Sequence, residues 1–322
     1  MEEIFKSLRV TLDQTFTTNF RQYIGRHLGT HEFVLISDYC IDDVGKPNDV
    51  IAFTIAPWHA VSSESMAALD RLIPTDIKKT SSLSTPSRNA LNDPRFFHIA
   101  FTLDDISGFL YSPTFDKRSV SLQNIDLIIE MIKSWHANQP EGREKFAEQI
   151  KRFQGLAREL GKRSASFKLF YRMLLTSMLA SIVAYYVTRE ALCRAIVWLP
   201  DRDKIHDAFG GIYVDIFELN HWGLCLAELP EWRIPKIGYT DTKTIGKNLW
   251  YDPLVRLPDY IAGTIASWDT TINRTSKEKH AKVLDHVIAD NPNCILVKFE
   301  MSKESWSFGI RPVVRLPFIG EP

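Results

Sequence analysis

Apolar residues follow strand-like patterns in several parts of the chain. Residues 33–40 and 50–56 are nearly continuous apolar runs, which predicts two strands buried on both faces. Residues 97–103 alternate between apolar and polar side chains, which predicts a third strand. Residues 195–199 form another short apolar run, which predicts a fourth buried strand. Further strands are predicted at 234–239, 294–299 and 306–316.

Helical spacing of apolar residues predicts most of the other elements. Helices are expected at 2–28 (ending at Gly29), 64–72, 122–135, 144–160, 167–192, 259–268 (opened by Pro258) and 281–288. The segment 212–219 is expected to be a strand or a short helix, and 80–95 a loop. Strands on both sides of a helical stretch predict one α/β domain over 1–322, with a helical insertion at 113–190 and a C-terminal extension at 271–322.

Composition narrows the class of protein. With 322 residues and 45% hydrophobic content, the chain can bury a large core, so intrinsic disorder is excluded. The 39 basic residues balance the 39 acidic ones, so any contact with nucleic acid must come from a local basic patch.

The four cysteines are widely spaced, which disfavours a zinc site or a disulfide framework. No signal peptide is recognisable, and the longest uncharged run, 173–188, is short for a membrane span. We therefore expect a cytoplasmic protein without a membrane anchor.

Several common catalytic motifs are missing from the sequence. There is no His-Glu-x-x-His motif, no Gly-x-Ser-x-Gly elbow and no Gly-x-x-x-x-Gly-Lys-Ser/Thr loop. These absences disfavour a zinc hydrolase, a serine hydrolase of that type and a P-loop nucleotidase.

Carboxylates stand at the ends of predicted elements that are far apart in the sequence. Asp38 ends the first strand, and Asp201 and Asp203 follow the strand at 195–199. Asp259 begins the late helix and shares one helical face with Ala262, Gly263 and Ala266. These small residues would let the helix approach the sheet closely and hold Asp259 near the strand ends. Carboxylate oxygens are the ligands that Mg²⁺ and Mn²⁺ prefer. The pattern predicts a metal site formed by Asp38, Asp201 or Asp203, and Asp259.

Each of these carboxylates also has an ordinary structural interpretation. Asp38 could end its strand by accepting backbone N–H bonds in a turn. Asp259 could be a first-turn charge that interacts with the helix dipole. Asp201 and Asp203 could flank Arg202 in a surface turn.

Three short segments carry a resemblance to a known family. They are Ser37-Asp38-Tyr39, Asp76-Ile77-Lys78-Lys79 and Pro258-Asp259-Tyr260-Ile261-Ala262-Gly263. Over roughly residues 31–270, the order of elements and these segments resemble an uncharacterised prokaryotic family of the ribonuclease-H-like type. The resemblance implies a ribonuclease-H-like mixed sheet with flanking helices, and metal-dependent nuclease activity. It also implies a setting in mobile elements or in host defence, such as antiviral defence.

The resemblance and the charge pattern lead to two functional hypotheses. In the first, a nuclease uses Mg²⁺ or Mn²⁺ to hydrolyse DNA or RNA, with Lys79 acting beside the scissile phosphate and Lys78 contacting nucleic acid. The basic stretch 151–172 would grip the phosphate backbone through Arg152, Lys162 and Arg163, although it could equally be a solvated helix face.

The second hypothesis is a non-catalytic subunit on the same fold. It would bind a protein partner through the helical insertion or the C-terminal extension. The family's opening acidic pair followed by Ser-Gly is absent here, because Asp38 has no acidic neighbour. Asp42 and Asp43, which precede Gly45, are therefore alternatives for the first ligand.

Overall fold

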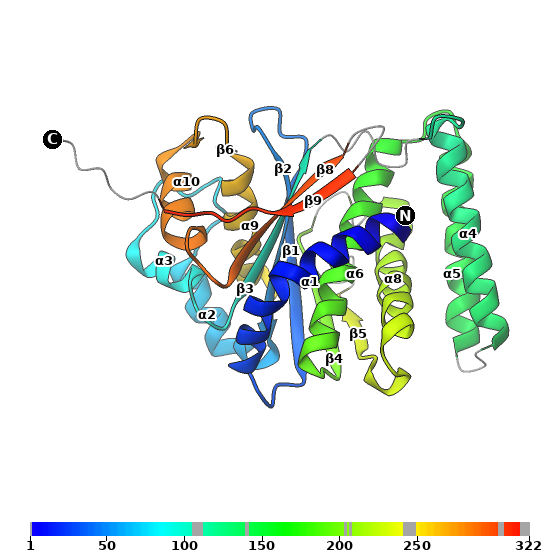
Figure 1. The fold of residues 1–322 in the computed structure, drawn as a ribbon, viewed down its shortest axis with the longest axis horizontal. Coiled ribbons are helices and arrows are strands. Elements are labelled where there is room, and N and C mark those ends of the chain that lie inside the picture. The colour runs from blue at the N-terminus through cyan, green and yellow to red at the C-terminus, as the bar shows by residue number, and fades with distance from the viewer. Residues whose placement is uncertain are drawn as a thin grey trace.

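A computed structural model of the chain describes residues 2–104, 112–138, 142–202, 205, 208–240, 249–301 and 306–315. Within these residues, a seven-stranded sheet is covered by helices on both faces (Figure 1). The protein is therefore of the α/β class, as the hydrophobic pattern predicts. A separate two-stranded ribbon consists of β6 (Trp268–Asp269) and β7 (Arg274–Thr275).

The main sheet is mixed, and its strands lie in the order β5-β4-β1-β2-β3-β8-β9. They are β1 (Glu32–Cys40), β2 (Asp49–Pro57), β3 (Phe97–Asp104), β4 (Ala195–Pro200), β5 (Lys236–Tyr239), β8 (Cys294–Met301) and β9 (Trp306–Ile310). The pairs β1–β2, β2–β3 and β8–β9 are antiparallel, whereas β1–β4, β4–β5 and β3–β8 are parallel. Because β1 and β4 run in the same direction, their C-terminal ends lie at the same edge of the sheet.

The apolar runs of the central strands are explained by burial on both faces. In β1, Phe33 and Leu35 belong to one hydrophobic core, whereas Val34 and Ile36 belong to the other. The first core includes residues from α1 (Glu2–Gly25), α4 (Lys117–Asn138), α5 (Arg143–Gly161), α6 (Phe167–Ala191) and α8 (Ile212–Glu228). The second includes residues from α2 (Ser63–Leu72), α3 (Thr85–Leu91), α9 (Asp252–Ala266), α10 (Glu278–Val283) and the π-helical turn Leu284–Ile288. Figure 1 shows these two groups on opposite sides of the sheet.

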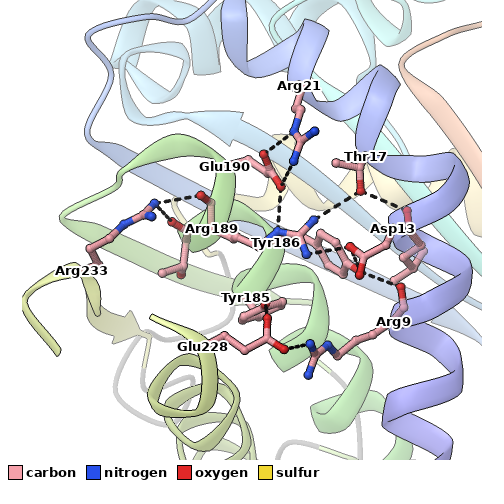
Figure 2. A network of polar contacts seen from close by, with 12 residues as sticks. Arg9, Asp13, Thr17, Arg21, Tyr185, Tyr186, Arg189, Glu190, Glu228 and Arg233 are labelled. Atoms are coloured by element: carbon pink, nitrogen blue, oxygen red, sulfur yellow. Dashed lines mark hydrogen bonds and ion pairs between the residues drawn. The ribbon is translucent and has the colours of Figure 1, made fainter. Parts of the chain in front are cut away.

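Polar contacts join α1 to α6 over the first core (Figure 2). Arg189 of α6 donates to Asp13 of α1 at 2.6 Å and to its neighbour Glu190 at 2.7 Å. Arg21 of α1 donates to the other oxygen of Glu190 at 2.7 Å. Tyr186 contributes its hydroxyl group, which donates to the carboxylate of Asp13 at 3.0 Å. The network therefore links α1 to α6 beside the first core.

Helix α6 is the most apolar element of the fold. Among the described residues it alone is long and apolar enough to cross a membrane, but 78% of its apolar window is buried inside the protein. Eighteen of its residues, from Phe170 to Thr188 with Arg172 excepted, are buried. This burial is that of a core helix in a soluble protein, as the length of the uncharged run predicts.

Several expected elements have other boundaries in the structure. The late helix begins at Asp252, so Pro258 lies inside α9 and does not open it. Pro253 takes the opening position, where the missing N–H has no intrahelical partner to lose. The expected loop at 80–95 contains α3, which Ser84 caps through the N–H of Ser87 at 3.2 Å. The segment 212–219 is the first part of the longer helix α8, and β9 ends at Ile310.

Candidate functional site

The C-terminal part of β1 carries Asp38. Its neighbours Val34 and Ile36, at alternate positions of the strand, pack into the core that contains α9. Because side chains of one strand face share that side of the sheet, Asp38 points toward α9. Its side chain is 7% exposed. A carboxylate with so little contact with water must be compensated by hydrogen bonds or by opposite charge.

The parallel pairing of β4 with β1 brings Asp201 to the same place. Ser37 pairs with Pro200, the last residue of β4. The next residue, Asp201, donates its N–H to the carbonyl oxygen of Ser37 at 2.8 Å. Asp201 therefore lies directly beside Asp38, at the shared edge of the sheet. The alternative ligand Asp203 lies outside the described residues.

Asp259 reaches this edge from the middle of α9. It is therefore not a first-turn charge, and the interpretation through the helix dipole is wrong. Its Oδ2 accepts the N–H of Ile77 at 2.7 Å. One turn further along α9, a Cβ atom on Gly263 would lie only 2.7 Å from Cγ2 of Ile77. The small residue on this face permits a close approach, but its neighbour is Ile77 of the segment 75–80, whereas the spacing predicted the sheet.

The carboxyl groups of Asp38 and Asp259 are buried in contact with each other. Burial raises the pKa of Asp38 well above its usual range, and the negative charges of Asp259 and Asp201 raise it further. Burial also raises the pKa of Asp259, while hydrogen bonds from Ile77 and Asp38 oppose that rise. The two side chains hydrogen-bond to each other, and this bond raises the pKa of Asp38 and lowers that of Asp259. Because two buried negative charges in contact repel each other, the contact favours uptake of a proton by Asp38.

A pocket of about 500 Å³ opens over these three carboxyl groups. Its other charged lining residues are Lys46, Asp76, Lys78, Lys79, Asp252 and Arg256. Lys78 and Lys79 are exposed, so both can reach a ligand in the pocket. Lys79 lies 3.3 Å from the carboxylate of Asp76. The pocket therefore combines carboxylates at its base with cations at its rim.

The segment 75–80, which carries these two lysines, is anchored by a residue from a distant part of the chain. The ammonium group of Lys279, in α10, donates to the carbonyl oxygens of Ile77, Lys78 and Thr80. Its side chain is buried, and burial lowers its pKa. Sequence reasoning did not single out Lys279, nor Lys46, Asp252 and Arg256 in the pocket. No local pattern marks Lys279 or Arg256, because each binds groups that are far away in the sequence.

Asp42 and Asp43, the alternatives for the first ligand, do not line this pocket. The carboxylate of Asp42 forms ion pairs with Lys168 at 2.7 Å and with Arg172, both on α6. Asp43 accepts the N–H of Gly45 at 3.2 Å within the turn. The structure therefore favours Asp38 over both alternatives.

The basic residues predicted on α5 lie apart from the carboxyl pocket. Arg152 donates to Asp215 of α8 through two bonds of 2.5 and 2.6 Å. Lys162 pairs with Glu159 at 2.5 Å, and Arg163 is exposed just beyond the helix. Arg152 and Lys162 line a different groove of about 690 Å³. Since α5 and α9 lie on opposite sides of the sheet (Figure 1), these residues and the carboxyl pocket form separate surfaces.

The carboxyl groups are not arranged around a common ion. In the part of the chain that the structure describes, no group of three or more Asp, Glu, His or Cys side chains could hold a metal as placed. Asp38 and Asp259 hydrogen-bond to each other, and Asp201 acts on them through its charge. The predicted three-ligand metal site stays a prediction.

Comparisons with known proteins identify no relative of this chain. No family model matches it, and neither the curated proteins nor the solved structures contain a significant match.

Proposed function

We propose that this protein is a cytoplasmic, divalent-metal-dependent hydrolase that cleaves phosphodiester bonds of nucleic acid. The observation that carries the proposal is the buried pair Asp38–Asp259, with Asp201 beside it, at the base of a pocket rimmed by lysines. Clusters of buried carboxyl groups with perturbed pKa values in a pocket are characteristic of functional sites. Such a cluster is costly for stability, since desolvated like charges repel.

The topology of the sheet supports a ribonuclease-H-like fold. An antiparallel meander, β1–β2–β3, is extended on the other side of β1 by the parallel strands β4 and β5. Asp38 lies on the first strand, Asp201 follows the fourth, and Asp259 lies on a helix after the fifth. This order of elements and acids agrees with the family that the sequence motifs resemble.

The donor set suits Mg²⁺ or Mn²⁺ in its chemistry. Asp38, Asp259 and Asp201 offer hard oxygen ligands, and the neighbouring negative charges add to the rise that burial causes in the pKa of Asp38. A divalent cation would compensate these negative charges, and Asp38, Asp201 and Asp259 are the residues that would hold it. When bound, such an ion activates water and stabilises the charge that develops on a phosphoryl group.

The cations at the rim supply the contacts that a polyanionic substrate needs. Lys78 and Lys79 belong to the segment 75–80. Hydrogen bonds from the ammonium group of Lys279, and from the N–H of Ile77 to Asp259, hold the backbone of this segment in place. Both lysines line the same pocket as the carboxyl pair, and both side chains are exposed. In this position they can bind a phosphate and keep the scissile bond over the carboxyl groups.

The test is cleavage of single- and double-stranded DNA and RNA with Mg²⁺, Mn²⁺ or EDTA. Wild type should cleave at least one substrate with metal and none with EDTA. Asp38→Asn and Asp259→Asn should each lower the rate about a hundredfold or more, because each removes a negative ligand at the reacting centre. Asp126→Asn on the exposed face of α4 is the matched control and should keep full activity.

If no cleavage is seen, a measurement of metal binding distinguishes a protein whose substrate was not among those tested from a protein without a metal site. Mn²⁺ should raise the melting temperature of wild type and of Asp126→Asn, but not that of Asp38→Asn, because only a native-state site stabilises the fold. If wild type neither cleaves nor gains stability from metal, the proposal fails. The non-catalytic interaction subunit is then the better hypothesis, and the α4–α5 hairpin beside α8 is the surface to test (Figure 1).

A further inference from the structure

The turn between β1 and β2 brings Lys46 to the carboxyl pocket. Lys46 lines this pocket together with Cys40, which follows Asp38 by two positions in β1. Alternate residues of a strand share one face, so Cys40 and Asp38 point to the same side of the sheet. Two residues span about 7 Å along a strand. Lys46 therefore adds a cation to the wall of the pocket close to its carboxyl groups.

Hydrogen bonds attach this turn to the end of α9. The main-chain N–H of Asn48 donates to the carbonyl oxygen of Ala266 at 3.2 Å. The side-chain amide of Asn48 donates to the carbonyl oxygens of Ile265 at 2.9 Å and Trp268 at 2.7 Å. Because α9 also carries one of the carboxyl groups, these bonds tie the backbone near Lys46 to the helix that forms another wall of the pocket.

The ammonium group of Lys46 has few acceptors within the protein, although its side chain is only 13% exposed. Among the described residues it donates one hydrogen bond, to Sγ of Cys40 at 3.0 Å. The carboxylate of Asp43 is 3.8 Å away, which is longer than a hydrogen bond. A thiol is a weak acceptor, and an ammonium group has three N–H donors. Two donors are therefore left for water or for a ligand in the pocket.

Lys46 differs in this respect from other cations of the pocket. Arg256 donates to the carboxylate of Asp70 at 2.7 Å and to the carbonyl oxygen of Ile73 at 2.6 Å, so its guanidinium group is bound to the protein. Lys79 is 73% exposed, so water and salt screen its charge. The charge of Lys46 is screened less, because its side chain is largely withdrawn from water.

We propose that Lys46 binds a phosphate group of the substrate inside the carboxyl pocket. The inference rests on the proposed function, because it assigns a further residue to the same site. A phosphate group brings several acceptor oxygens, which the remaining N–H donors of Lys46 can bind in charge-assisted hydrogen bonds. Such a contact offsets the repulsion between the phosphate and the carboxyl groups. Lys78 and Lys79 would then hold the strand at the rim.

The test is the binding of short, fluorescently labelled single strands of DNA and RNA, measured by anisotropy in EDTA so that the strands stay intact. Lys46→Met should weaken binding about tenfold at low salt, the usual effect of losing a hydrogen bond between charged groups. It should also reduce the slope of log affinity against log salt concentration by about 0.7, the value for one phosphate contact on a single strand. Lys46→Arg keeps the charge and should keep the slope. Lys133→Met, on the exposed face of α4, is the matched control and should bind as wild type does.

The slope distinguishes a phosphate contact from a merely structural role. A variant that binds weakly only because part of it is unfolded keeps the slope of wild type, since its folded fraction makes the same contacts. Equal slopes for wild type and Lys46→Met, or no binding of any strand by wild type, would overturn the inference. If Lys46→Met does not fold, Lys46→Gln gives the same comparison.

Cleavage with Mg²⁺ or Mn²⁺ tests the proposed function separately. Cleavage by wild type together with an unchanged slope in Lys46→Met would keep the nuclease and overturn the role of Lys46. Binding that depends on Lys46, without cleavage by wild type under either metal, would support the phosphate contact and refute the nuclease.

Discussion

The carboxyl groups of Asp38 and Asp259 show how burial creates reactivity at single positions. An isolated aspartate at the surface of a protein has an ordinary pKa. Burial and the contact between the two favour the binding of a proton or a cation. The same reasoning applies to other buried ionisable groups of the chain, in particular to the histidines of the core.

His98 is such a group, and it predicts a dependence of stability on pH. Its Nε2 donates to the carbonyl oxygen of Leu91 at 3.1 Å, and its Nδ1 lies 2.9 Å from the hydroxyl oxygen of Thr54. Burial lowers the pKa of His98 from 6.5 to about 4. The unfolded chain therefore takes up a proton at higher pH than the folded one. The stabilisation is complete above about pH 6.5 and is lost as the pH falls toward 4.

Urea unfolding at pH 7.5 and 5.5 measures this effect. His98→Gln should reduce the loss of unfolding free energy between the two pH values by about 1 kcal/mol relative to wild type. Exposed His31→Gln controls for replacing an imidazole in general. An unchanged difference between the two pH values in His98→Gln would contradict the assignment of a neutral His98 in the folded state.

Helix α9 connects local packing to the carboxyl pocket. It supplies Asp259, and Gly263 on the same face lies against Ile77, whose N–H binds that carboxylate. Proline would ordinarily interrupt a helix, because it lacks the N–H that bonds to the carbonyl four residues earlier. Pro258 is nevertheless tolerated inside α9, where the helix is buried between the sheet and the segment 75–80.

Gly263→Ala should destabilise the protein by about 1–3 kcal/mol, because the added Cβ overlaps Cγ2 of Ile77. The double variant Gly263→Ala/Ile77→Ala should lose less than the sum of the two single variants in thermal or urea unfolding. Gly155→Ala in α5, where nothing lies within 4 Å of the added atom, is the matched control. It should stabilise by up to about 1 kcal/mol through helix propensity. Strict additivity at Gly263 and Ile77 would contradict the contact.

The arrangement of the helical layers depends on contacts between distant parts of the chain. Residues of α1 are joined to α6, about 170 positions later, through Asp13, Arg21, Arg189 and Glu190 (Figure 2). The neighbouring charges raise the pKa of Arg189 and lower that of Glu190, although burial opposes both shifts. Both shifts favour the charged forms of Arg189 and Glu190, as expected for groups that form ion pairs.

Arg189→Met should lower the unfolding free energy by about 2 kcal/mol, because it leaves Asp13 and Glu190 without a shared donor in a partly buried place. Arg71→Met, at an exposed position at the end of α2, should change stability by less than about 0.5 kcal/mol. Chemical denaturation at low and moderate salt measures both. An Arg189→Met loss as small as that of Arg71→Met would show that the network does not stabilise the contact between α1 and α6.

Periodicity alone predicts most strands and helices of this protein, because the burial of one face imposes a repeat of two or of 3.6 residues on the sequence. It also places Asp38 and Asp201 at strand ends, since those positions depend only on where an apolar run stops. Periodicity does not predict the boundaries of α9 or the presence of α3. These depend on Pro253 and Ser84, which act through local capping geometry that competes with other turn signals.

The tertiary structure decides what these acids form together. Parallel pairing of β4 with β1 places Asp201 beside Asp38, and α9 adds Asp259, which lies 221 residues after Asp38 in the chain. The tertiary structure also pairs Arg152 with Asp215, and Asp42 with Lys168 of α6. The order of charges along the chain does not reveal these ion pairs. The local pattern of apolar residues indicates which positions are buried. The partner of each charged residue, in contrast, depends on pairing between distant segments. For this reason the sequence identifies the acids, and only the fold shows which of them share a pocket.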